Sequence, residues 1–137
     1  PEEGYRTVAI SRRDARWRTI LEDLERLAGD EELTDAVFLF HSPPYKTALD
    51  RADLDGKMVD HAPLDVHVGS IAIQRFIKKR RPAVTLHGHV HESVGITGRW
   101  QETIGRTVAI GGAHDGPELA LVLLDPAHPE DAVRRLL

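Results

Sequence analysis

The chain has 137 residues, a formal net charge of −4, 41% hydrophobic residues and 29% charged residues. This length predicts one domain, or part of a larger one, with enough chain to bury a core. The acidic balance gives no electrostatic basis for binding nucleic acid or a membrane surface. Cysteine is absent, which excludes disulfides and thiolate metal sites, and no apolar run approaches the roughly 18 residues of a membrane span. We therefore expect a soluble, cytoplasmic protein.

The N-terminal third shows a strand, helix and strand pattern. Residues 6–10 are predicted as a short strand. From Asp14 to Ala28, apolar residues recur at helical spacing with charged residues between them, which predicts an amphipathic helix ending at Gly29. Residues 36–40 form a continuous apolar run, which is typical of a strand buried on both faces.

A long segment without a clear period, residues 42–68, follows that strand. Segments of this length inside a compact domain are usually functional or mobile. A second helix is predicted between Ser70 and Pro82, followed by a strand over residues 83–87. Ser70 would cap this helix, although amides exposed at a helix start also suit a phosphate oxygen.

The pattern changes in the last third of the chain. Short strands separated by glycine-rich turns are predicted over residues 94–96, 107–110 and 119–124, as parts of an antiparallel meander. Prolines at positions 126 and 129 punctuate a short predicted final helix. The alternation of strands and helices predicts an α/β fold.

Histidines follow two of the predicted strands. His41 comes after the first, and His87, His89 and His91 lie within five positions at the end of the second. Ligand sites of open α/β sheets lie beyond the carboxyl ends of the strands, so His41, His89 and His91 are expected to converge there. Imidazole is a common ligand for transition metals, so the sequence predicts a metal site at this edge.

These motifs resemble those of the calcineurin-like metallophosphoesterases, in their prokaryotic branch. The run Phe40-His41-Ser42-Pro43-Pro44-Tyr45 looks like the family's strand-end histidine followed by prolines, and Gly88-His89-Val90-His91 looks like its closing G-H-x-H motif. Residues 111–117 are similar to the segment that follows. The resemblance covers essentially the whole chain but only the C-terminal half of the family's domain.

The resemblance implies a fold and a reaction. Residues 1–137 would form a single partial domain, the C-terminal half of a four-layer αββα sandwich with a mixed sheet and helices on its outer face. The reaction would be hydrolysis of a phosphomonoester or phosphodiester by a hydroxide that two divalent metal ions (manganese, iron or zinc) activate. His41 and His89 would bind one ion and His91 the other, and Gly88 would let the backbone turn tightly beside them.

The family's upstream motifs, D-x-H, G-D-x-x-D and G-N-H-[DE], are not matched in order. The chain contains no asparagine, so the third motif, with the histidine expected as general acid, is absent. Asp65-Val66-His67 matches D-x-H by its letters, but it lies after His41 in a predicted loop, and we interpret it as a chance match. No catalytic residue is therefore identified in this chain.

Three neutral imidazoles without a carboxylate would bind two dications weakly. This predicts that the N-terminal half of the same domain supplies the remaining ligands, and that the chain is inactive alone. Two alternatives remain open at this stage. One is a protein with a mononuclear zinc site built from His41, His89 and His91. The other is a non-catalytic structural or interaction fragment.

Other polar residues have two possible roles each. His87 is expected to make a structural hydrogen bond rather than to bind metal. His114 either reaches the edge of the site or bonds to Asp115 within a turn. Three basic residues of the long loop either meet a substrate phosphate or simply charge its surface: Lys46, Arg51 and Lys57. The remaining histidines of the C-terminal two thirds are interpreted as solvated: His61, His67 and His128.

Overall fold

The computed structural model describes residue 11 and residues 19–137. Its elements, in chain order, are α2 (Ile20–Ala28), β1 (Val37–Phe40), η1 (Ala48–Asp50), β2 (Met58–Val59), β3 (Ala62–Pro63), α3 (Ile71–Arg80), β4 (Val84–His87), α4 (Ser93–Thr97), β5 (Gln101–Ile104), β6 (Thr107–Gly111), β7 (Ala120–Asp125) and β8 (His128–Leu136). No helix in the described part is long and apolar enough to cross a membrane.

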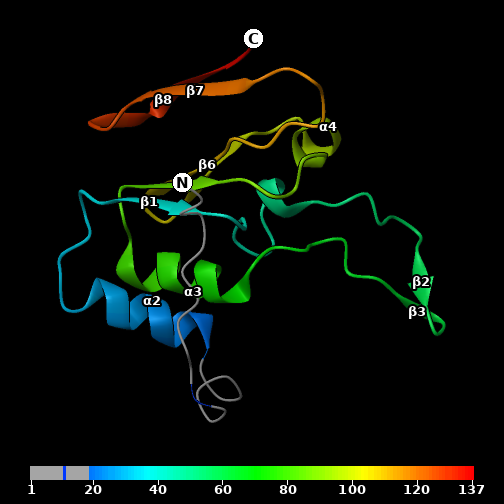
Figure 1. Ribbon diagram of the computed structural model, residues 1–137, viewed down its shortest axis with the longest axis horizontal. Coiled ribbons are helices and arrows are strands. Elements are labelled where there is room, and N and C mark those ends of the chain that lie inside the picture. The colour runs from blue at the N-terminus through cyan, green and yellow to red at the C-terminus, as the bar shows by residue number, and fades with distance from the viewer. Residues whose placement is uncertain (1–10, 12–18) are drawn as a thin grey trace, which may run out of the picture.

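A mixed four-stranded sheet with the strand order β1-β4-β6-β5 forms the centre of the fold. Strands β1, β4 and β6 are parallel, and β5 runs antiparallel to β6. Figure 1 shows helices α2 and α3 on one side of this sheet and the β7–β8 hairpin on the other. The predicted α/β class is confirmed.

Aromatic packing joins the sheet to the helices. Phe76 of α3 is fully buried, and its ring makes edge contacts with Phe38 and Phe40 of β1 at centroid distances of 5.3 and 6.2 Å. Apolar residues of α2 complete this cluster. Lys79 and Arg80, in the basic last turn of α3, bind Glu25 of α2 at 3.0 and 3.1 Å, which ties the two helices together.

The first predicted helix begins later than expected. Thr19 has an extended backbone and forms a capping box with Glu22, so α2 starts at Ile20 rather than at Asp14. Its predicted end at Gly29 is confirmed, since this glycine has a φ of 54°. Residues 14–18, and the strand predicted over residues 6–10, lie outside the described residues.

The opposite face of the sheet is covered only in part. Val84, Val108 and Ile110 pack with Ala132 of β8. The pairing of β1 with β4 places Val37 and Leu39 on this same face, yet they are 42% and 78% exposed. The prediction that β1 is buried on both faces is therefore wrong, because the packed cluster includes β4, β6 and the hairpin but no residue of β1.

Three predictions for the C-terminal third are corrected. Residues 94–96 lie in helix α4, which ends at Gly98 with a φ of 68°. The predicted final helix is strand β8, because Pro126 sits in a tight turn closed by the side chain of Asp125 on the amide of Ala127. Strand β6 pairs with β4 and β5, and β7 pairs with β8, so the strands do not form one continuous meander.

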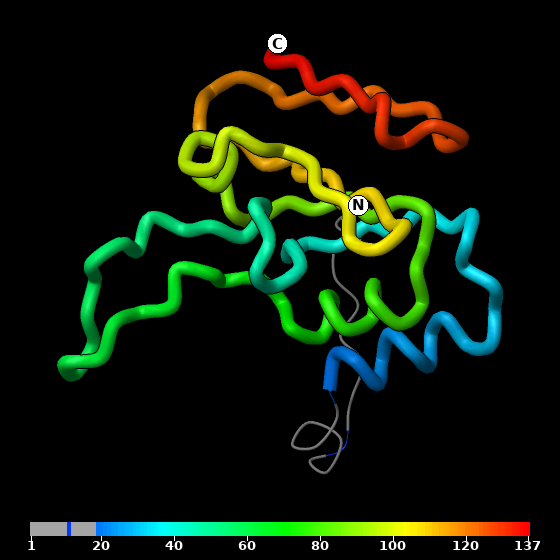
Figure 2. Tube along the Cα trace, turned by 180° about the vertical axis from the view of Figure 1, so that it is seen from behind, coloured from blue at the N-terminus to red at the C-terminus, as the bar shows by residue number. Residues whose placement is uncertain are grey.

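The long segment after β1 forms an extended arm. Figure 2 shows it leaving the sheet, extending away from the body of the molecule and returning to α3. Its tip is the two-stranded β2–β3 ladder. At its base, Ser70 donates its amide to Pro43 at 2.8 Å and accepts from the amide of Tyr45 at 3.2 Å. The two ends of the arm are therefore joined next to the residues that follow His41.

Candidate metal centre

The C-terminal ends of three neighbouring parallel strands lie at one edge of the sheet. The register aligns Phe40, His87 and Gly111 across β1, β4 and β6. The ladder continues past the strands, because Gly88 donates to the carbonyl of His41 at 3.1 Å and Gly112 donates to that of His87 at 2.8 Å. These hydrogen bonds fix the positions of the segments that carry the histidines.

His41 and His89 are brought together at this edge although they lie 48 residues apart in the chain. His89 Nδ1 is 2.9 Å from His41 Nε2, and the ring centroids are 4.7 Å apart. Both side chains are exposed to solvent. The predicted convergence of these two side chains is therefore present in the fold.

The backbone of His89 is held in an uncommon conformation. Its φ is 76°, in the left-handed region that a non-glycine residue seldom adopts. The prediction that Gly88 supplies the tight turn is wrong, because Gly88 has no positive φ and a Cβ there would meet only the His41 carbonyl, at an ordinary 3.7 Å. Backbone strain of this kind is characteristic of ligand-binding sites, and here it falls on the residue whose ring meets His41.

The His41–His89 pair suits two ligands of one metal ion. Zinc binds imidazole nitrogen at about 2.0–2.1 Å, so two nitrogens on one tetrahedral ion lie roughly 3.3 Å apart. The observed 2.9 Å is a hydrogen-bond distance, so binding one ion would need the two nitrogens to move apart slightly and the rings to turn towards the ion. His91 is exposed on the next turn, and no three His, Asp or Glu side chains of the described part gather as a metal site.

His87 lies beneath this pair and has a structural role. Its Nδ1–H donates to the carbonyl of Ser42 at 2.9 Å, and its Nε2 accepts from the hydroxyl of Thr85 at 2.8 Å. Burial lowers the pKa of His87 from 6.5 to about 4, so the ring is neutral at physiological pH. Both nitrogens are used within the fold, as expected for a histidine that does not bind metal.

The stability of the metal-free protein should reflect this depressed pKa. Below pH 6.5 the His87 ring becomes protonated in the unfolded chain, whereas in the folded chain it becomes protonated only near pH 4. The free energy of unfolding therefore decreases as the pH is lowered from 6.5 to 4, by up to about 3 kcal/mol from this group. In urea unfolding with chelator present, the stability difference between the wild type and His87→Gln should narrow from pH 7 to pH 4. A constant difference would contradict this account.

A second polar cluster at the base of the arm was missed in the sequence. Asp50 is fully buried, and its carboxylate accepts hydrogen bonds from the amides of Lys46, Thr47 and Gly69 at 2.9, 3.0 and 3.1 Å. It also meets His67 Nδ1 at 2.7 Å. The interpretation of His67 as a solvated residue is therefore wrong. No local pattern pairs Asp50 with a residue 17 positions away.

The D-x-H letters at 65–67 do not form a ligand pair. Asp65 accepts from the hydroxyl of Tyr45 and from the amide of His67, the latter at 2.9 Å. The imidazole of His67 turns to Asp50 instead. The interpretation of this match as chance agrees with the geometry.

All three basic residues of the arm contact other residues of the arm. Arg51 Nη2 donates to Asp55 at 2.7 Å, and Lys57 Nζ donates to the carbonyl of Asp53 at 2.6 Å. Lys46 lies over the ring of Tyr45, 5.4 Å from its centroid. Ser70 caps α3, because its hydroxyl accepts from the amide of Ile73 at 3.2 Å. Arg51 and Lys57 are thus held by the arm itself.

His114 lies on an open depression beside the histidine turn. This depression has a volume of about 420 Å³ and is lined by His89 and His91 on one side and by His114 and Glu118 on the other. His114 Nε2 is 3.0 Å from Glu118 Oε2, so the predicted bond to Asp115 is replaced by one to Glu118. This contact lowers the pKa of the Glu118 carboxyl. The other two histidines are exposed as predicted: His61 and His128.

No family model matches the sequence, and no curated protein is significantly similar to it. A solved crystal structure is similar with a TM-score of 0.46 and 23% sequence identity, over 73% of this chain and 32% of the other. The chain therefore spans about a third of the length of that protein. This likeness carries no argument about function.

Proposed function

We propose that this chain is the C-terminal part of a calcineurin-like metallophosphoesterase domain that hydrolyses a phosphomonoester or phosphodiester. The observation that carries the proposal is the His41–His89 pair, with nitrogens 2.9 Å apart beyond the carboxyl ends of two parallel strands. In α/β sheets this edge is where ligands bind. His41 and His89 would hold one divalent ion, and His91 would contribute to a second.

The donor set supports a partial site. Three exposed imidazoles are neutral ligands that suit manganese, iron or zinc, but they supply no negative charge to balance two dications. The metal ions, when bound, supply Lewis-acid activation of water and neutralise the phosphate. The chain's own contribution is to position the backbone segments that carry the imidazoles, through the Gly88 and Gly112 hydrogen bonds. The missing carboxylates are expected from the N-terminal half of the domain.

The uncovered part of the sheet agrees with a half-domain. Val37 and Leu39 point away from the helices and stay exposed on β1. In a sandwich of two sheets with helices outside, this inner face would pack against the second sheet. The proposed αββα architecture therefore accounts for an apolar strand face that the described residues leave open.

Metal stoichiometry and turnover test the proposal. We expect the 137-residue chain to bind manganese weakly and to show no turnover. A polypeptide that also carries the upstream half should bind two ions and hydrolyse an aryl phosphomonoester or phosphodiester. Two tightly bound ions with turnover in the 137-residue chain would contradict the half-site.

The two alternatives predict different results in the same measurements. A mononuclear zinc protein would bind one zinc ion tightly in this chain, and would lose it on substitution of any of the three histidines. A non-catalytic fragment would show no turnover in either polypeptide with any metal. Its exposed β1 face would also give it a size in solution that depends on concentration.

A further inference from the structure

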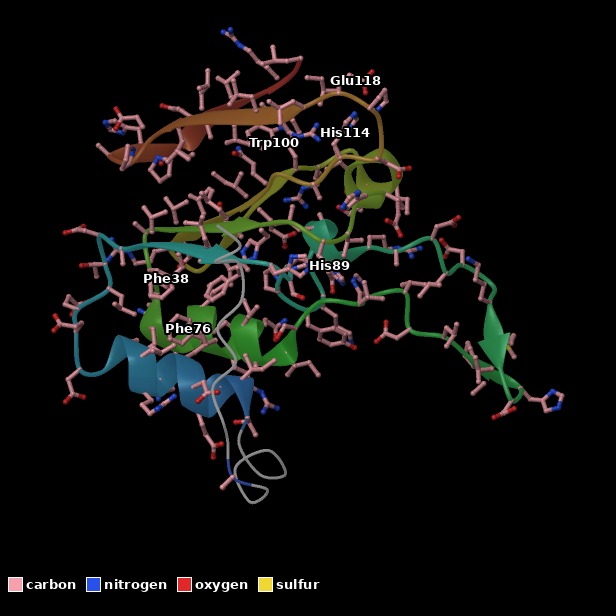
Figure 3. All side chains as sticks on the ribbon, in the orientation of Figure 1. Phe38, Phe76, His89, Trp100, His114 and Glu118 are labelled. Carbon is pink, nitrogen blue, oxygen red and sulfur yellow. The ribbon has the colours of Figure 1, made fainter. Side chains whose placement is uncertain are left out.

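The depression beside the histidine turn has two walls of different chemistry. One wall carries His89 and His91, which the proposed function assigns to metal ions. The other is formed by the segment 112–120, which leads from the end of β6 into the first residue of β7. Figure 3 shows His114 and Glu118 next to each other on this segment, above the sheet edge that carries His89. A phosphate held by the metal ions would therefore direct the rest of its ester towards the segment 112–120.

The second wall is largely apolar and fixed in position. It contains Ala113, Leu119 and Ala120. The side chain of Leu119 is 64% exposed, although its backbone is paired with Leu137 through two hydrogen bonds of 3.0 Å. Arg134 of β8 donates to the carbonyl of Ala113 at 3.0 Å, which anchors the start of the segment. Because hydrogen bonds hold the backbone of Leu119 in place, its exposed side chain offers a ligand an apolar contact that is already formed.

The polar part of this wall is the His114–Glu118 pair. The two side chains meet at 3.0 Å across the turn Asp115-Gly116-Pro117. A Cβ at position 116 would lie 2.2 Å from Glu118 Oε2 and 2.6 Å from His114 Nε2, so the two side chains close over Gly116 and would have to move aside for a larger residue. This wall therefore combines an apolar surface with one hydrogen-bonding imidazole and one carboxylate.

We propose that the segment 112–120 binds the organic group of the phosphate ester and selects an uncharged, apolar or aromatic group. This inference rests on the proposed function, which places the phosphate on the opposite wall. Leu119 contacts the apolar surface of the group, and His114, whose Nε2 is engaged by Glu118, lies beside it. Glu118 repels an ester that carries a further anionic group, such as a carboxylate or a second phosphate.

Phosphonates that cannot be hydrolysed test this inference separately from catalysis. Binding of phenylphosphonate and methylphosphonate is measured by calorimetry on the polypeptide with both halves and manganese, and turnover is measured independently. Leu119→Ala should weaken phenylphosphonate binding about tenfold and leave methylphosphonate binding unchanged, because only the larger group reaches the wall. Leu123→Ala, which changes an exposed leucine of β7 that does not line the depression, is the matched control.

A second variant tests the role of charge. Glu118→Gln should bind 4-carboxyphenylphosphonate about threefold more tightly than the wild type does, with little change for phenylphosphonate. An unchanged phenyl-to-methyl affinity ratio in Leu119→Ala, or no phosphonate binding at all, would overturn the inference. Absence of turnover in a protein that binds the phosphonates as expected would overturn the proposed function instead.

Discussion

Replacing His41 with alanine is expected to lower manganese affinity at least about 100-fold in the polypeptide with both halves, and to lower phosphoesterase turnover accordingly. Loss of a hydrogen-bonding partner behind a metal ligand already costs about 10- to 100-fold in metal affinity or activity, and loss of a ligand should cost more. His41 is exposed, and its ring meets His89 at the sheet edge, so the fold should tolerate the change. Calorimetric titration with manganese and a thermal unfolding curve with chelator measure both effects.

Paired variants make this test specific to a shared ion. If His41 and His89 bind the same metal, the double variant should bind that ion little worse than either single variant, because the first substitution already removes the site. His61→Ala, which changes an exposed histidine in the arm, is the control and should have no effect. Effects of His41→Ala and His89→Ala that add fully, or metal affinity unchanged in His41→Ala, would contradict the proposed centre.

The convergence of His41 and His89 could be predicted because it depends on topology. Both residues follow apolar runs of strand length, and the helix between those runs makes a parallel pairing the natural connection. The caps of α2 and α3 were also visible, as Gly29 and Ser70. These features are local in the sequence, or follow from a general rule about parallel strands.

The predictions that were wrong concern residues whose conformation or burial depends on neighbouring parts of the fold. Residues 128–136 contain Pro129 and four charged residues, and only pairing with β7 makes them a strand. The exposure of Leu39 depends on which part of the sheet the β7–β8 hairpin covers, and an apolar run cannot show this. The positive φ of His89 is also invisible beside a glycine that looks like the obvious turn residue. Tertiary context overrides local propensity in each case.

The conformation of the arm, residues 42–68, also depends on contacts between residues far apart in the sequence. Asp50 makes several of these contacts at the base of the arm. Replacing Asp50 with alanine is expected to lower the free energy of unfolding by about 3–5 kcal/mol, the usual cost of breaking a buried ionic group from its partners. The substitution removes the acceptor for three backbone amides and for His67 Nδ1. Buried amides left without an acceptor cost about 1–3 kcal/mol each before relaxation.

A comparison with His67→Ala separates the two functions of this carboxylate. That variant removes one of the four hydrogen bonds and leaves the three amides satisfied, so it should cost only about 1–2 kcal/mol. Gly69 packs so closely that a Cβ there would lie 2.7 Å from Asp50 Oδ2, so the carboxylate also fixes the return of the arm to α3. Asp50→Ala should therefore increase proteolytic cleavage within residues 51–66 more than His67→Ala does. Equal urea-unfolding losses for the two variants would show that the carboxylate serves mainly to orient His67, and that the backbone of the arm does not depend on it.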